Sequence, residues 1–287
     1  MNVRPLEELF AGPDGAFPRM TALVGAGGKT TLMYALAGRM VAAGEKVICT
    51  TTTKIFPPEG LPLLLMREGE DAGDGEAARA GGISSRGGEN AGLDRAAARI
   101  REALEGTPCL VLAARRLPGT GKLEGLSPES LASLAQALPG ARWIVEADGA
   151  ARKPLKAPAA HEPVLPLRPD CCVAVLGLDG VGRPLDEAHV HRAARACALT
   201  GQMVGSMVTP RTLARLAVHE DGLFRACPDS CRRLVFANKG DLPGAADAAR
   251  QASEEAFRLA GRAEWAVGSA AGSWWSPLGI LPSHDIP

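Results

Sequence analysis

The feature of this chain that most limits its fold is a regular alternation between continuous apolar runs and segments with helical periodicity. A strand that is apolar on both sides is buried on both faces, so the pattern predicts a mostly parallel sheet covered by helices. We therefore expect an α/β protein of three layers around a central sheet of about seven strands. The strand candidates are residues 20–24, 46–50, 108–113, 142–147, 171–177, 233–237 and 264–267, and the helix candidates are 30–43, 94–104, 128–138, 185–200, 210–219 and 245–261.

Length and composition are those of a globular protein with a sizeable core. The chain has 287 residues, of which 46% are hydrophobic and 22% charged. Length alone allows one large domain or two. The motifs described below favour a single domain over residues 1–287. We expect a mobile insert near residues 69–92, where Gly, Ala, Ser and charged residues gather, and a tail that frays after residue 271.

Charge and hydropathy argue against several classes of partner. Lys and Arg together number 32, as do Asp and Glu, so we expect no nucleic-acid surface. No apolar run approaches the ~20 residues of a membrane span, and the first residues lack the apolar core of a signal peptide. These observations predict a cytoplasmic protein with no membrane partner, and they leave the oligomeric state open.

The seven cysteines predict neither a disulfide framework nor a metal site, and four of them, Cys49, Cys109, Cys171 and Cys172, lie in apolar strand candidates and are predicted to be core residues. An odd number in a chain of this kind argues against paired disulfides. Cys227 and Cys231 are four residues apart, without the second pair of ligands that a zinc site needs. His189 and His191 would share a face only on a strand, and their segment is predicted to be helical.

A phosphate-binding loop follows the first strand candidate. The sequence Leu-Val-Gly-Ala-Gly-Gly-Lys-Thr-Thr at residues 23–31 runs from an apolar strand into a predicted helix. Glycines allow backbone N–H groups to curve around phosphate oxygens, and the helix N-terminus adds partial positive charge. Lys29 can reach the outer phosphates, and the Thr30 hydroxyl can ligate Mg²⁺. The predicted nucleotide-binding residues here are Gly25, Ala26, Gly27, Gly28, Lys29, Thr30 and Thr31.

This loop departs from the full GxxxxGK[ST] pattern. Leu23 stands where the first glycine of that pattern belongs. A dinucleotide-binding GxGxxG would need glycine at Thr30 and would not explain Lys29. The alternative without a ligand is a glycine-rich turn between a strand and a helix. The lysine at the helix start favours a nucleoside triphosphate.

A second motif, Asn-Lys-Gly-Asp at residues 238–241, follows the strand candidate 233–237. It resembles the guanine-recognition motif of GTPases. The Asp241 carboxylate would accept hydrogen bonds from guanine N1–H and the exocyclic amine, which adenine cannot supply. Asn238 would tie this segment to the phosphate loop, the Lys239 stem would pack on the base, and Ser269-Ala270 would offer a backbone N–H to guanine O6. The alternative is an ordinary turn.

A third motif places two carboxylates at the end of a strand. Glu146 and Asp148 follow the apolar residues 142–145. In phosphate-loop proteins an Asp at this place holds the Mg²⁺ shell, so we expect Asp148 and Thr30 to be metal ligands. Glu146 is a second candidate partner, and either carboxylate could orient water or an acceptor hydroxyl. The alternative for Asp148 is a helix cap or turn.

Two further segments are candidates for binding an anionic acceptor. Thr52 and Thr53 lie in a run of four threonines that ends a strand and precedes Lys54. Lys153 and Lys156 lie in the long loop after Asp148, where their charge could also stabilise a transition state. His161 is the candidate for proton transfer there. Solvated hydroxyls and an exposed basic loop are the alternatives.

Taken in order, these motifs resemble the YqeC family, which is described as accessory proteins of selenium-dependent hydroxylases. The resemblance rests on the phosphate loop, the threonine run, Glu146-Ala147-Asp148-Gly149-Ala150, Pro154-Leu155-Lys156-Ala157-Pro158, His161-Glu162-Pro163, Val175-Leu176-Gly177-Leu178-Asp179, Val190-His191-Arg192, Thr209-Pro210 and residues 238–241. It implies a role in maturing selenium-dependent molybdenum hydroxylases, with an apo-hydroxylase as protein client. Whether this protein handles selenium itself is left open.

The shortened loop also resembles the Gly-Thr-Asn-Gly-Lys-Thr-Thr of Mur-type ligases, which use ATP. The main alternative is therefore an ATP-dependent ligase or kinase with a small-molecule acceptor. A third reading is a non-catalytic chaperone switched by nucleotide. Residues 238–241 have no role in a ligase, so we expect Mg²⁺-dependent binding and hydrolysis of a nucleoside triphosphate, GTP before ATP.

Overall fold

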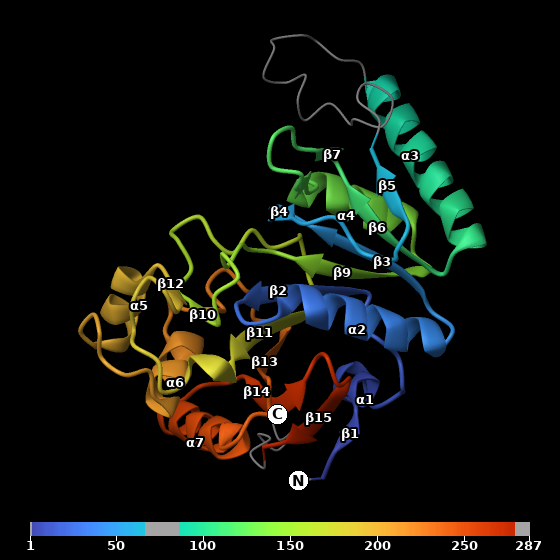
Figure 1. The fold of residues 1–287 in the computed structure, drawn as a ribbon. Coiled ribbons are helices and arrows are strands. Elements are labelled where there is room, and N and C mark those ends of the chain that lie inside the picture. The colour runs from blue at the N-terminus through green and yellow to red at the C-terminus, as the bar shows by residue number, and fades with distance from the viewer. Residues whose placement is uncertain (1, 67–85, 279–287) are drawn as a thin grey trace.

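The computed structural model describes residues 2–66 and 86–278 as a mixed α/β fold around one large sheet (Figure 1). Ten strands form this sheet in the order β1-β15-β14-β13-β11-β2-β9-β3-β6-β5. The strands from β14 to β5 are mutually parallel, while β15 runs antiparallel to both β14 and β1. Their bounds are β1 Arg4–Pro5, β2 Met20–Gly25, β3 Lys46–Thr51, β5 Leu63–Leu65, β6 Cys109–Ala113, β9 Ala141–Glu146, β11 Cys171–Gly177, β13 Arg232–Asn238, β14 Glu264–Ser269 and β15 Trp274–Pro277.

The α/β class and the mostly parallel sheet are confirmed, but the expected strand number was too low. All seven strand candidates belong to the parallel part of the sheet. The three additional strands, β1, β5 and β15, lie at the two edges and have two to four residues each. Strands this short carry too little periodicity to be distinguished from loops.

Successive side chains of the parallel strands pack into two separate hydrophobic cores, one on each face of the sheet. Val173 and Val175 of β11 pack on the face covered by α1 (Leu6–Phe10) and α2 (Lys29–Ala42). Ala174 and Leu176 pack on the opposite face, which α5 (Ala193–Thr200), α6 (Pro210–Val218) and α7 (Ala245–Arg258) cover. This two-residue period on a strand that is buried throughout produces the three layers.

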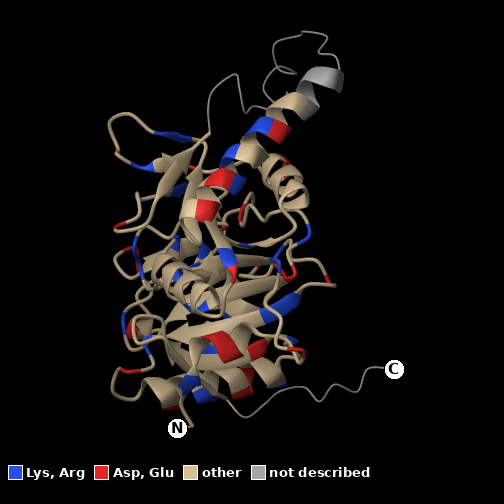
Figure 2. Cartoon of the chain, turned by 90° about the vertical axis from the view of Figure 1, so that its right-hand side faces the viewer, with Lys and Arg blue, Asp and Glu red and all other residues tan. Residues whose placement is uncertain are grey.

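On the α5–α7 face, a second group of helices covers the β9, β3 and β6 end of the sheet. It consists of α3 (Arg86–Gly106) and α4 (Pro128–Ala137). Helix α4 begins where Ser127 accepts a hydrogen bond from the Ser130 N–H and Pro128 fills the first turn. Arginines and acidic residues are mixed along α3 (Figure 2). Among the described residues, no helix combines the length and apolarity needed to cross a bilayer.

The helix expected over residues 185–200 was wrong in its first half. Helix α5 begins only at Ala193, and β12 (Val190–His191) precedes it and pairs with β10 (Leu155–Lys156). Two local features prevent an earlier start. The Asp186 carboxylate accepts the N–H groups of Ala188 and His189, and Arg192 adopts a left-handed φ of 62°. The remaining elements are the short helix η2 (Leu178–Gly180) and a small sheet of β4 (Lys54–Ile55), β8 (Leu123–Glu124) and β7 (Arg115–Arg116).

The segments expected to be irregular contain some regular structure. Residues 86–92 of the expected insert belong to α3, while residues 67–85 lie outside the described part. Beyond residue 271, Trp274–Pro277 form β15 rather than a frayed tail, and residues 279–287 again lie outside the described part. All seven cysteines are buried free thiols.

Candidate functional site

The loop between β2 and α2 is held tightly by its neighbours. Gly25, Gly27 and Gly28 have φ values of 90°, 89° and 122°, which side-chain-bearing residues rarely adopt. A Cβ added at Gly27 would overlap the backbone of Gly177, and one added at Gly28 would overlap the Asn238 amide. The glycines therefore allow the carboxyl ends of β11 and β13 to close against the loop.

The curved loop leaves backbone N–H groups available at the start of α2. Gly28 is the N-cap residue and supplies no side-chain capping bond. Among the described residues, the Ala26 N–H pairs with the Val175 carbonyl, whereas no acceptor is found for those of Gly27, Lys29 and Thr30. Uncapped N–H groups at a helix start, next to a lysine, form an anion-binding cradle.

Lys29 is the buried cation of this cradle. Only 4% of its surface is exposed, and its Nζ donates to the Gly25 carbonyl at 2.6 Å. The same Nζ lies 3.0 Å from Asp148 Oδ1 and 3.7 Å from Glu146 Oε1. Burial lowers the pKa of Lys29, but attraction to Asp148 and Glu146 outweighs it and the pKa lies above its ordinary value. Lys29 is therefore a charged group.

The two carboxylates reach the loop because β9 is the direct neighbour of β2, with Glu146 opposite Leu23. They make different contacts. Glu146 accepts the Thr30 hydroxyl at 2.7 Å, and burial raises its pKa despite the nearby Lys29. Asp148 accepts the Gly25 N–H at 3.0 Å and faces Lys29. Glu146 is thus the carboxylate beside the Thr30 hydroxyl, and Asp148 is the one that anchors the loop.

This donor set fits a magnesium ion better than a closed metal site. In the described residues, no three His, Cys, Asp or Glu side chains converge as metal ligands. Mg²⁺ keeps several waters and is bound by one or two carboxylates together with substrate phosphates. The Thr30 hydroxyl and the Glu146 carboxylate, 2.7 Å apart at the mouth of the cradle, are ligands of that kind.

A buried ion chain continues from Lys29 away from the loop. It consists of Lys29, Asp148, Lys156, Glu162 and Arg192. Lys156 is fully buried, and its Nζ lies 2.9 Å from Asp148 Oδ2 and 2.7 Å from Glu162 Oε2. Arg192 then binds both Glu162 oxygens, at 2.7 and 3.0 Å. Burial raises the pKa of Glu162, but hydrogen bonds from Lys156 and Arg192 outweigh it and bring the pKa to about 2.

Asn238 joins the phosphate loop to the end of β14. Its Nδ2 donates to the Gly27 carbonyl at 2.8 Å, and its Oδ1 accepts the Ala270 N–H at 2.9 Å. The Ala270 N–H, which was expected to contact guanine O6, therefore already has a partner. Ser269 next to it is buried at the end of β14.

Lys239 and Asp241 of the Asn-Lys-Gly-Asp segment are more open to solvent, whereas Gly240 between them is buried. Lys239 pairs with Asp179 at 2.5 Å, with both side chains about one-third exposed or more, and Asp241 is exposed. Lys153, expected to bind an acceptor, pairs instead with Glu187 at 3.0 Å. These ion pairs are more open to water than the buried ion chain.

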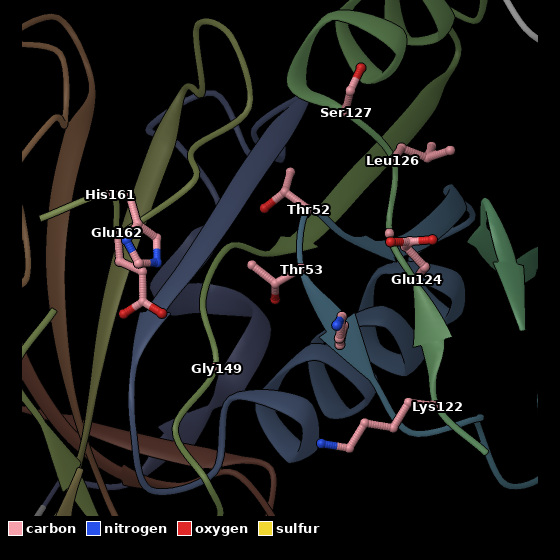
Figure 3. Close-up of a pocket in the computed structure, with 11 residues that line it drawn as sticks. Thr52, Thr53, Lys122, Glu124, Leu126, Ser127, Gly149, His161 and Glu162 are labelled. Atoms are coloured by element: carbon pink, nitrogen blue, oxygen red, sulfur yellow. The ribbon is translucent and has the colours of Figure 1, made fainter. Parts of the chain in front are cut away.

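A pocket of about 630 Å³ lies beside the ion chain, at the carboxyl ends of β3 and β9. Figure 3 shows Thr52 and Thr53 between His161 and Glu162 on one side and Glu124 on the other. Three of the expected site residues, Thr52, Thr53 and His161, therefore line one cavity. The complete lining is Thr52, Thr53, Lys54, Lys122, Glu124, Gly125, Leu126, Ser127, Gly149, His161 and Glu162.

Sequence reasoning did not assign a role to Glu162, Arg192 or Lys122. Glu162 and Arg192 belong to motifs that carried the family resemblance, but their pairing depends on the β10–β12 contact. Lys122 lies in the turn before β8, where one lysine among polar residues gives no signal of a pocket.

Two comparisons with known proteins bear on these residues. A family model described as "YqeC protein" matches residues 21–194. The chain is also similar to the uncharacterized protein YqeC of Escherichia coli (strain K12), with 30% identity over 223 residues that cover 77% of this chain and 76% of that protein. The chain belongs to the YqeC family. The resemblance seen in the motifs is thereby confirmed.

The YqeC family model includes most of the candidate site and leaves out one part. Residues 21–194 contain the phosphate loop, the carboxylates Glu146 and Asp148, and the whole buried ion chain. Asn238 and Asp241 lie beyond this range. The phosphate side of the site therefore belongs to the part that the YqeC model describes.

Proposed function

We propose that this protein binds a Mg²⁺–nucleoside triphosphate at the loop between β2 and α2 and hydrolyses it. The observation that carries the proposal is the meeting of Lys29 and Thr30, at an uncapped helix start, with Glu146 and Asp148 from the neighbouring strand. Backbone N–H groups and a charged lysine there suit the phosphates. The Thr30 hydroxyl and a carboxylate suit the metal.

The contacts suggest a division of roles between the two carboxylates. The Thr30 hydrogen bond supports Glu146 as the carboxylate nearest the metal. Asp148 holds the Gly25 N–H and the buried ion chain, so its negative charge keeps Lys29 in place near the phosphates. In this proposal Asp148 supports the metal site indirectly, and Glu146 is the carboxylate beside the metal. The Thr30–Asp148 ligand pair expected from sequence stays a prediction.

For the base, we propose that GTP is preferred over ATP. The support is the position of Asn238, which ties residues 238–241 to the phosphate loop as the guanine-binding role requires. Asp241 is exposed three residues further on and is available to a base edge. A carboxylate that pairs with two guanine N–H groups would meet an acceptor nitrogen on adenine.

The biological role that we propose is in the maturation of selenium-dependent molybdenum hydroxylases, with an apo-hydroxylase as protein client. The support is membership of the YqeC family, together with the hydroxylase role that the resemblance of the motifs implies. A slow hydrolase of this kind should turn over faster with its client. An ATP-dependent ligase or kinase would instead require a small-molecule acceptor, and the pocket beside Thr52 and Thr53 keeps this second candidate open.

Removing the Lys29 charge tests the phosphate site. Lys29→Ala should weaken triphosphate binding by roughly 2–5 kcal/mol, the scale for losing one partner of a buried charge pair. Calorimetric titration of GTP with Mg²⁺ measures this loss, and circular dichroism shows whether the fold persists. The matched control is Lys46→Ala, which changes an exposed lysine at the amino end of β3. Unchanged affinity in folded Lys29→Ala would refute the phosphate-loop assignment.

Changing the Asp241 carboxylate tests the choice of base. Asp241→Asn should lose GTP affinity and gain affinity for xanthosine triphosphate, whose edge presents a carbonyl that the Asn amide can donate to. We expect a shift of several kcal/mol in the GTP-to-XTP preference, because the mismatched partner leaves a polar group unpaired. Competition of ATP, GTP and XTP for a fluorescent nucleotide measures it. A wild-type preference for ATP, or an unchanged ranking in the variant, would make residues 238–241 a turn.

A further inference from the structure

The pocket of about 630 Å³ opens on the same edge of the sheet as the phosphate loop. Gly149 lies three residues after the end of β9, directly after Asp148, and Thr52 and Thr53 follow β3. The pocket therefore lies next to the two strands that come after β2 in the sheet order, β9 and β3. In open α/β sheets this edge, beyond the carboxyl ends of the strands, is where ligands bind. The position is that of a second substrate beside the outer phosphates.

The pocket wall that carries Gly125 and Leu126 is fixed to the end of β3. The Gly125 N–H donates to the Thr53 carbonyl and the Leu126 N–H to the Thr51 carbonyl, both at 2.9 Å. A Cβ at Gly125 would overlap the Thr51 carbonyl, so only glycine permits this close approach. Two hydrogen bonds and this close contact make the cavity a built feature rather than a gap between mobile loops.

The negative charges of the pocket are already balanced by the protein. Glu162 is bound by Lys156 and Arg192, and Glu124 is paired with Arg115 at 2.5 Å. These two glutamates therefore contribute little net charge to a ligand in the pocket.

The positive charges are not balanced. Within the described residues, neither Lys54 nor Lys122 has a carboxylate partner. Lys122 Nζ lies 4.9 Å from the centre of the Phe56 ring, and the Arg152 guanidinium lies 4.4 Å from the same ring. Figure 3 shows the Lys122 amino group extending back toward the Gly149 side of the cavity. Two cations without anionic partners leave the pocket with a net positive field.

We propose that this pocket binds the oxyanion group of a small second substrate, with Lys54 and Lys122 holding its charge. Lysine donors are suited to either a phosphate or a carboxylate. The inference rests on the proposed nucleotide function in one respect: the pocket is useful to that reaction because it lies beside the outer phosphates. The binding of the anion itself needs only the pocket.

The buried ion chain connects the two sites. Glu162 and Gly149 line the pocket, and both contact Lys156, at 2.7 Å each. Lys156 contacts Asp148, which faces Lys29 in the phosphate loop. When a bound phosphate attracts Lys29, the Asp148 carboxylate relies more on Lys156 for charge compensation. Occupancy of one site should therefore change the affinity of the other, and by the same factor in both directions.

The experiment titrates the full-length protein with inorganic phosphate and with malonate by calorimetry. One arm uses protein saturated with Mg²⁺ and a non-hydrolysable GTP analogue, so that the phosphate loop is occupied. The second arm uses Lys29→Ala without nucleotide, so that the pocket is tested even if no nucleotide binds. The variants Lys54→Gln and Lys122→Gln are compared in both arms with Lys46→Gln, an exposed lysine at the amino end of β3.

We expect saturable binding of one probe, weakened about tenfold or more by Lys122→Gln or Lys54→Gln, which is the scale for one charge-assisted contact. Lys46→Gln should leave it unchanged, and the probe that saturates identifies phosphate or carboxylate. Absence of saturable binding in both arms overturns the proposal, and so does an equal loss in Lys46→Gln. Failure of the nucleotide function alone would appear as anion binding in the second arm with no binding of the GTP analogue in the first.

Discussion

Glu146 and Glu162 are two buried glutamates at opposite ends of one site, and their pKa values move in opposite directions. At the phosphate loop, Glu146 has the Lys29 ammonium 3.7 Å away and a single hydroxyl donor, and burial raises its pKa. At the pocket, Glu162 has Lys156 and Arg192 at 2.7 Å, and although burial raises the pKa, these donors bring it down to about 2. Distance and number of cations decide which effect prevails.

The opposite pKa shifts distinguish a carboxylate that can accept a further cation, Glu146, from one whose charge is already compensated, Glu162. Glu146 is buried beside a single cation that lies 3.7 Å away, so a metal ion beside Thr30 would compensate its charge more fully. Glu162 already has its charge satisfied and serves to hold Lys156 and Arg192 in place. Glu146 is therefore suited to binding a metal ion, and Glu162 to holding its two cations in place.

The largest expected effect comes from removing the cation at the centre of the chain. Lys156→Met should lower the free energy of unfolding by about 3 kcal/mol, the lower end of the range for breaking a buried ion pair, because Asp148 and Glu162 each keep one other cation. Urea denaturation followed by circular dichroism measures it. Lys46→Met, an exposed lysine, is the control and should change stability by less than about 0.5 kcal/mol. A loss below about 1 kcal/mol for Lys156→Met would mean that water reaches the chain and that Glu162 is not fixed by it.

Much of this site could be predicted from sequence because its phosphate side is local. The loop, Lys29 and Thr30 are consecutive, and Glu146 and Asp148 end an apolar strand, so strand pairing alone brings them together. Glu162 and Arg192 could not be assigned in this way. Their contact requires β10 to pair with β12, and that pairing replaces the expected helix around Val190.

The same contrast holds for the fold. The seven central strands are apolar on both faces, so they can be recognised in the sequence as continuous apolar runs. The edge strands β1 and β15 are short, and β1 is exposed, so neither gives a periodic signal. Strand pairing at an edge depends on tertiary position, which sequence patterns do not record.

A second prediction separates the two carboxylates beside the loop. Glu146→Gln should weaken triphosphate binding in Mg²⁺ by about 10- to 100-fold, the scale for disturbing a metal's supporting groups, and should matter little in EDTA. Asp148→Asn should weaken binding in both conditions, because it removes the charge that holds Lys29. Nucleotide affinities of both variants with Mg²⁺ and with EDTA make the comparison. If instead Asp148→Asn shows the Mg²⁺-specific loss, the sequence-based assignment of Asp148 as metal ligand is the better one.

The smallest expected effect is on the pH dependence of stability, and its sign differs between the two glutamates. The folded-state pKa of Glu162 is lowered from 4.5 to about 2, so its contribution is present above pH 4.5 and is lost as pH falls toward 2. The folded-state pKa of Glu146 is raised above 4.5, so its contribution is present below pH 4.5 and is lost as pH rises through the folded-state pKa. Stability should therefore fall less steeply with acidification in Glu162→Gln than in the wild type, and more steeply in Glu146→Gln.

The slope of unfolding free energy against pH should change by the equivalent of at most about one bound proton, because each variant removes one titrating group. Urea midpoints measured from pH 2 to pH 7 in EDTA, without nucleotide, give both slopes. Slopes that change in the same direction in both variants would show that the two ends of the ion chain are not electrostatically different.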